Sequence, residues 1–95
     1  MATFEICADV SSAQPAAIQA ALIELIEGTL TSTASGFRVV GTVDGEDVEV
    51  ANRTLFAALC DIEPRTTWLA QWKFEGTVQR YVDLTVQRTF AAASA

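Results

Sequence analysis

The chain has no histidine, only six lysine and arginine residues, and no long apolar run in its 95 residues. Without histidine, the commonest general base and the usual partner of a catalytic serine or cysteine are absent. No run reaches the roughly 18 apolar residues that a membrane-spanning helix needs. The N-terminus shows no basic start followed by an apolar stretch and a cleavage site. These absences favour a cytoplasmic, non-enzymatic protein without a membrane span.

Basic residues are scarce and scattered, whereas twelve acidic residues give a net charge of −6. Proteins that grip phosphate backbones use clustered lysine and arginine, so direct binding to nucleic acid is not expected. The acidic residues are spread along the chain except at 44–49. This charge is typical of a soluble surface. Mimicry of nucleic acid needs a dense, one-sided acidic field.

Metal-binding and phosphate-binding patterns are also missing. Cys7 and Cys60 lie far apart, and without histidine they cannot complete the usual four-ligand zinc site. The acidic segment 44–49 does not have the spacing of a calcium-binding loop. No glycine-rich phosphate loop precedes a helix. The sequence predicts no metal and no cofactor, and it leaves the redox state of the two thiols open.

What is present indicates one domain. Length and a half-apolar composition predict a single domain over residues 1–90, followed by an alanine-rich tail, 91–95, that is expected to fray. Residues 3–10 alternate between apolar and polar and predict a half-buried strand. Ser11 or Ser12 is then predicted to cap a helix that ends near Gly28.

The middle of the chain predicts a hairpin. Asp44-Gly45 is a strong signal for a two-residue turn, here between strands 37–43 and 46–50. The register that this turn implies places the apolar residues of both strands on one face. Asn52 is predicted to cap a second helix, 53–62, which Pro64 ends.

The C-terminal third predicts two further strands, 66–75 and 78–90. Gly76-Thr77 between them resembles a tight turn, but its register divides the apolar side chains between two faces. One solution is a three-residue loop or a bulge near Gly76, which for instance pairs Ala70 with Val82. The other keeps the tight turn and buries both faces, one of them against a partner.

The resulting order, β-α-β-β-α-β-β, predicts an α+β fold in the form of a two-layer sandwich with both helices on one sheet face. In order of elements, it matches a ferredoxin-like core with an extra C-terminal strand.

The face that the helices leave open carries the candidate interface residues Val40, Leu69 and Tyr81. Such faces commonly pair with a second copy, so we expect a binding or assembly module that joins through this face or the C-terminal hairpin. The partner is a second copy or another protein. A small-ligand binder or minor enzyme, with Trp68 or Trp72 as a wall of a pocket between helices and sheet, is an alternative. An acidic inhibitor of a basic protein is another.

Overall fold

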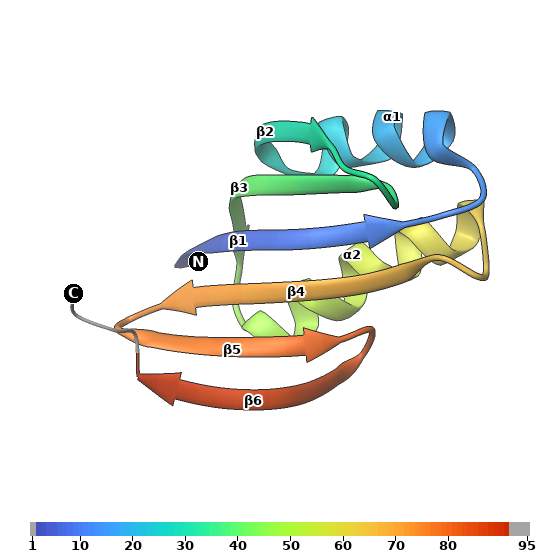
Figure 1. The fold of residues 1–95 in the computed structure, drawn as a ribbon. Helices are drawn as coiled ribbons and strands as arrows, with labels where there is room; N and C mark the ends of the chain where they lie inside the picture. The colour runs from blue at the N-terminus through green and yellow to red at the C-terminus, as the bar shows by residue number, and fades with distance from the viewer. Residues whose placement is uncertain (1, 92–95) are drawn as a thin grey trace.

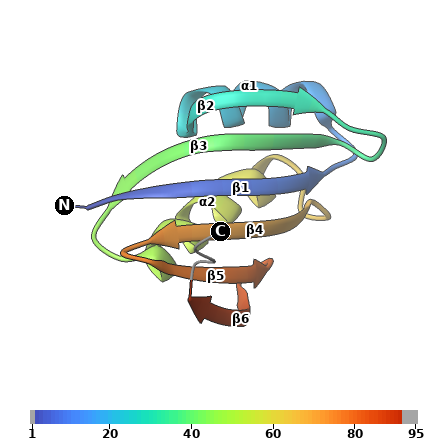
Figure 2. The same ribbon diagram turned by 60° about the vertical axis from the view of Figure 1, so that its left-hand side comes forward.

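The computed structural model describes residues 2–91, which form a six-stranded antiparallel sheet and two helices (Figures 1 and 2). The predicted α+β class is confirmed, with one strand more than expected. Along the chain, the elements are β1 (Ala2–Ser11), α1 (Pro15–Leu25), β2 (Glu27–Ser32), β3 (Phe37–Gly45), α2 (Val48–Ile62), β4 (Thr67–Phe74), β5 (Thr77–Val82) and β6 (Thr85–Ala91).

The strands are ordered β2-β3-β1-β4-β5-β6 across the sheet, and every neighbouring pair is antiparallel. Both helices lie behind the sheet in Figure 1, and no described element covers its front. β1 therefore lies near the centre of the sheet, whereas β2 and β6 form its two edges.

The first strand and helix follow the sequence pattern with small differences at the ends. The apolar residues of β1, from Phe4 to Val10, are buried in alternation, as predicted. The helix begins at Pro15 after Gln14, which makes no side-chain cap, so the predicted serine cap is wrong. The helix also ends earlier than predicted, at Leu25, because the buried Ile26 is extended and leads into β2. Gly28 lies inside that strand.

The predicted hairpin over 37–50 is wrong. Residues 37–45 form β3 as one long strand, but its partners are β1 and β2. Asp47 instead caps α2, because its carboxylate accepts hydrogen bonds from the backbone N–H groups of Glu49 (2.7 Å) and Val50 (3.4 Å). The buried residues of α2 recur at helical spacing: Val48, Ala51, Asn52, Leu55 and Leu59. Asn52 is thus inside the helix and does not cap it.

The C-terminal region contains two tight hairpins. β4 and β5 are joined by Glu75-Gly76, whose φ angles of 48° and 74° are both positive, as a type I′ turn requires. The tight turn thus lies one residue earlier than predicted. Ala70 pairs with Tyr81, so neither predicted register is correct.

The predicted strand 78–90 is interrupted at Asp83-Leu84, where the chain turns into β6. The bulge lies between Arg80 and Tyr81, in the pairing of β5 with β6, and not near Gly76. Ala91 ends β6; residues 92–95, most of the tail that was expected to fray, lie outside the described residues.

The core fills the space between the sheet and the helices. Phe4 packs edge-on against Trp72 and Phe74, with ring centroids 6.3 and 5.6 Å apart. Ile18 and Leu22 of α1 and Leu55 and Leu59 of α2 close the core from the helix side. No helix within residues 2–91 has the length and apolar character to cross a membrane.

Candidate functional site

The sheet surface opposite the helices, here called the outer face, is not covered by any described element. Strand register and exposure together define it. Its accessible strand residues are Thr3, Glu5, Cys7, Asp9, Glu27, Thr29, Thr31, Arg38, Val40, Thr42, Asp44, Thr67, Leu69, Gln71, Lys73, Arg80, Val82, Thr85 and Arg88.

Two adjoining hollows indent the outer face. One, of about 410 Å³, is lined by residues that include Cys7, Gln71 and Arg80. The other, of about 400 Å³, extends toward the loop between β2 and β3. Both hollows are lined by Asp9, Arg38 and Leu69, which lie at their common boundary. The face is therefore indented near its centre.

The polar side chains of the outer face are held in place by cross-strand contacts. Arg38 Nε donates to Asp9 Oδ1 at 2.9 Å, and Thr3 Oγ1 donates to Asp44 Oδ1 at 2.6 Å. The hydrogen bond from Arg38 to Asp9, then the Asp9 charge and Cys7, raise the pKa of Arg38 above its ordinary value, so Arg38 stays cationic. Arg80 donates to Gln71 Oε1 at 3.1 Å.

The outer face is electrically balanced, in contrast to the rest of the molecule. It carries four acidic and four basic side chains: Glu5, Asp9, Glu27 and Asp44, and Arg38, Lys73, Arg80 and Arg88. The entire net charge of −6 thus belongs to the helices and turns. Two copies can bring their outer faces together without the repulsion expected from the overall charge.

Two of the three predicted interface residues lie on this face. Val40 is 51% exposed and Leu69 is 52% exposed, as alternation predicted. The placement of Tyr81 on this face is wrong: it is 3% exposed and belongs to the core. Because the turn lies at Glu75-Gly76, Tyr81 pairs with the buried Ala70 and shares its inward direction.

The two tryptophans proposed as walls of a ligand pocket are fully buried. Trp68 Nε1 and Trp72 Nε1 both donate to Oδ1 of Asn52, at 2.8 and 3.0 Å. Nδ2 of Asn52 donates to the Asp83 carbonyl at 2.9 Å. Neither indole lines the hollows described in this section. Both rings serve as core and join α2 to β4.

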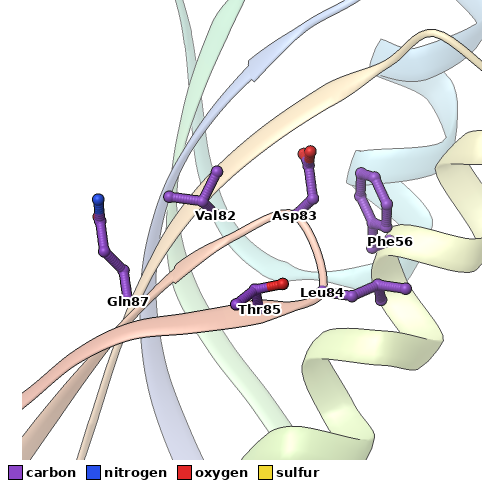
Figure 3. Close-up of a pocket in the computed structure, with 6 residues that line it drawn as sticks. All are labelled: Phe56, Val82, Asp83, Leu84, Thr85 and Gln87. Carbon is purple, nitrogen blue, oxygen red and sulfur yellow. The ribbon is translucent and has the colours of Figure 1, made fainter.

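A third hollow, of about 520 Å³, lies beside the turn between β5 and β6. Figure 3 shows Phe56 of α2 next to Leu84 of this turn, with Thr85 and Gln87 following along β6. Leu84 and Val86 are about half exposed. This apolar surface belongs to the C-terminal hairpin, which the sequence offered as the second possible interface.

The acidic side chains and the two thiols do not form a metal site within residues 2–91. No cluster of three or more cysteine, aspartate or glutamate side chains is placed to hold a metal ion there. Cys7 is an exposed free thiol, and Cys60 is a partly buried one. Burial, then Asp83 and Asp61, raise the pKa of Cys60, which makes its thiolate less available. A polar hollow of about 370 Å³ at the start of α2 is lined by Glu46, Asp47 and Glu49.

Alternation places Glu5, Asp9 and Lys73 on the outer face, but Arg80 and Arg88 were not predicted to lie there. A signal was present, because the strand residues within 67–91 include three basic residues and no acidic one. This signal becomes visible only once the turns at Glu75 and Asp83 are located, since Glu75 and Asp83 are the only acidic residues within 67–91.

Comparisons with known proteins supply no relative. No protein family, curated protein or solved structure matches the chain.

Proposed function

We propose that this chain is a non-enzymatic, cytoplasmic assembly module that forms a homodimer through its outer face. The observation that carries the proposal is the contrast between this face and the remaining surface. No element of residues 2–91 covers the face, its charges balance, and it exposes Val40 and Leu69, in a molecule whose other surfaces carry the whole charge of −6. Contact between two outer faces buries both apolar side chains and keeps the acidic helix layers apart.

We also propose that β1 to β4, with the two helices, form a ferredoxin-like core. Its support is the order β2-β3-β1-β4, in which all neighbours are antiparallel and both helices lie on the same side. β5 and β6 then extend this core at the β4 edge. The extension raises the number of strands on that side of β1 from one to three and widens the outer face with β5 and β6, which bring Arg80 and Arg88.

The test is the mass of the protein by sedimentation equilibrium at micromolar concentration. The wild type is expected to be a dimer, and Leu69→Glu and Val40→Arg to be monomers, because each places a charge in the contact. Ile23→Glu is the matched control: Ile23 is 64% exposed but lies on α1, away from the face. This variant should stay dimeric. A monomeric wild type, or equal behaviour of all variants, contradicts the proposal.

The C-terminal hairpin is tested in the same series. Leu84→Glu charges the apolar surface beside Phe56 and leaves the outer face intact. We expect this variant to remain a dimer. If Leu84→Glu produces monomers while Leu69→Glu does not, the hairpin is the interface and the outer face is not.

The two thiols give an independent measurement on the unmodified protein. Alkylation of Cys7 should slow as the protein concentration rises, because Cys7 lies in the outer face. Cys60 lies on α2 and should react at a rate that does not depend on concentration. Equal concentration dependence at both thiols, or none at either, contradicts a dimer formed through this face.

A second candidate function is inhibition of a basic protein, since the helices and turns carry eight acidic residues against two basic ones. Binding to a purified basic nuclease should then weaken steeply as salt is raised, because contacts between exposed charges are screened. Binding that is absent, or equally strong at high salt, contradicts this function.

A further inference from the structure

The charges of the outer face are divided between its two halves. The acidic half, formed by β2, β3 and β1, carries Glu27, Asp44, Glu5 and Asp9 against Arg38 alone. The basic half, formed by β4, β5 and β6, carries Lys73, Arg80 and Arg88 and no acidic strand residue. An excess of three negative charges thus lies beside an excess of three positive charges, with the boundary between β1 and β4.

A dimer formed through one face is related by a two-fold axis that lies in the interface. An axis parallel to the strands places the acidic half of each copy on the basic half of the other. An axis perpendicular to the strands, in the same plane, places each half on its own counterpart. The first arrangement brings opposite charges together twice, and the second brings like charges together twice.

In such a dimer, the two facing sheets lie close enough for their charged side chains to interact. Packed sheets lie about 10 Å apart, and lysine and arginine side chains cover much of that distance. Their charged ends therefore approach the facing sheet within the screening length of about 8 Å at physiological salt. Complementary charge across an interface chiefly selects orientation and register.

We infer that the second copy sits on the outer face about an axis parallel to the strands, with acidic half on basic half. The inference rests on the homodimer proposed above and adds its orientation. An axis at the boundary between β1 and β4 leaves three strands on each side and gives the largest overlap. Glu5 and Lys73 pair across this boundary, so each copy's Glu5 lies opposite the other copy's Lys73.

Charge reversal within one half tests the orientation. Lys73→Glu/Arg80→Glu turns the basic half acidic, so that both contacts of the homodimer become repulsive. We expect its dissociation constant to rise by at least about tenfold. The matched control is Arg53→Glu/Arg65→Glu, which changes the net charge equally but alters only positions in and after α2. Its dissociation constant should change much less.

The complementary variant Glu5→Lys/Glu27→Lys makes the acidic half basic and should weaken the homodimer in the same way. Mixing the two reversed variants should restore a tight heterodimer, because every contact is again between opposite charges. Recovery in the mixture also shows that both variants are folded.

The possible results distinguish a failure of the inferred orientation from a failure of the proposed homodimer. If the wild type is a monomer, the homodimer itself is contradicted. If the wild type is a dimer but Lys73→Glu/Arg80→Glu dimerises as well or better, the homodimer stands and the orientation is wrong. Like halves then face one another, since this substitution relieves repulsion only in that arrangement. Equal weakening by the control variant also overturns the inference, because net charge would then explain the loss.

Discussion

At the scale of single residues, Asn52 joins three parts of the core that are distant in sequence. Its side chain accepts from the indoles of Trp68 and Trp72 and donates to the carbonyl of Asp83. Asp83 in turn exchanges two hydrogen bonds with the backbone of Trp68, at 2.8 and 3.0 Å. Every buried side-chain polar atom of the described residues has a partner. The amide of Asn52 thus provides hydrogen-bond partners for two indole N–H groups and one backbone carbonyl.

Asn52→Leu should lower the free energy of unfolding by about 2–4 kcal/mol, because it leaves two indole N–H groups and a carbonyl without partners. Urea denaturation measures the loss. Arg53→Leu, at the next and exposed position of α2, should stay within about 0.5 kcal/mol of the wild type. Losses of similar size in both variants contradict a role for the buried network.

The titration of Tyr81 should make the stability of the protein depend on pH in the alkaline range. Burial, and then the charges of Glu49 and Asp47, raise the pKa of Tyr81 in the folded protein above its usual value of about 10. The folded state therefore holds the phenolic proton more tightly than the unfolded state. The stability from this group is complete below pH about 10 and is lost as pH rises through the folded-state pKa.

Because Tyr81 is the only tyrosine, the absorbance of tyrosinate reports its titration alone. The titration midpoint should lie above that of the urea-unfolded chain. Tyr81→Phe should lose less stability than the wild type between neutral and strongly alkaline pH. A midpoint at or below that of the unfolded chain contradicts the burial of the phenol.

Sequence patterns located the candidate interface residues only where alternation held. Val40 and Leu69 were placed correctly because β3 and β4 alternate without interruption. Asn52 was interpreted as a cap because its chemistry suits that position, whereas its partners lie 16 and 20 residues away. Tyr81 was misplaced because a shift of one residue at a turn reverses every side chain that follows it.

At the scale of elements, the hairpin of β4 and β5 depends on a turn with one unfavourable residue. Glu75 has a positive φ angle of 48°, which asparagine and glycine tolerate better than glutamate. Glu75→Asn should raise the free energy of unfolding by about 0.5 kcal/mol. Gly76→Ala should lower it by about 1 kcal/mol, because φ is 74°.

The two turn substitutions are compared by urea denaturation under identical conditions. No atom lies within 4 Å of a Cβ built on Gly76, so a loss in Gly76→Ala reports backbone conformation and not a clash. Changes of the same sign in both variants contradict the type I′ turn.

Sequence patterns missed three elements, each for a different physical reason. β2 is an edge strand whose residues are exposed except for the half-buried Leu30, so it has no alternation to detect. Residues 46–50 alternate as a strand would, but the carboxylate of Asp47 begins a helix there. Apolar residues continue through the turn at Asp83-Leu84, which the hydrogen bonds of Asp83 to Trp68 stabilise.

At the scale of the whole molecule, the uneven distribution of charge distinguishes the two sides of the sheet. In the proposed homodimer, the acidic helix layers are separated by both sheets, a distance well beyond the screening length of about 8 Å. Their mutual repulsion is therefore largely screened at physiological salt. The charges of the outer faces are in contact and are screened much less.

Raising sodium chloride from about 0.15 M to about 1 M shortens the screening length to about 3 Å and should therefore act mainly on the contact charges. With acidic half on basic half, these charges attract, so the dissociation constant should rise by at least about threefold. With like halves together, the same salt relieves repulsion and the constant falls. The variant Lys73→Glu/Arg80→Glu should reverse the sign and associate more tightly at high salt. Sedimentation equilibrium at the two salt concentrations measures both effects, and the same sign in wild type and variant contradicts the orientation.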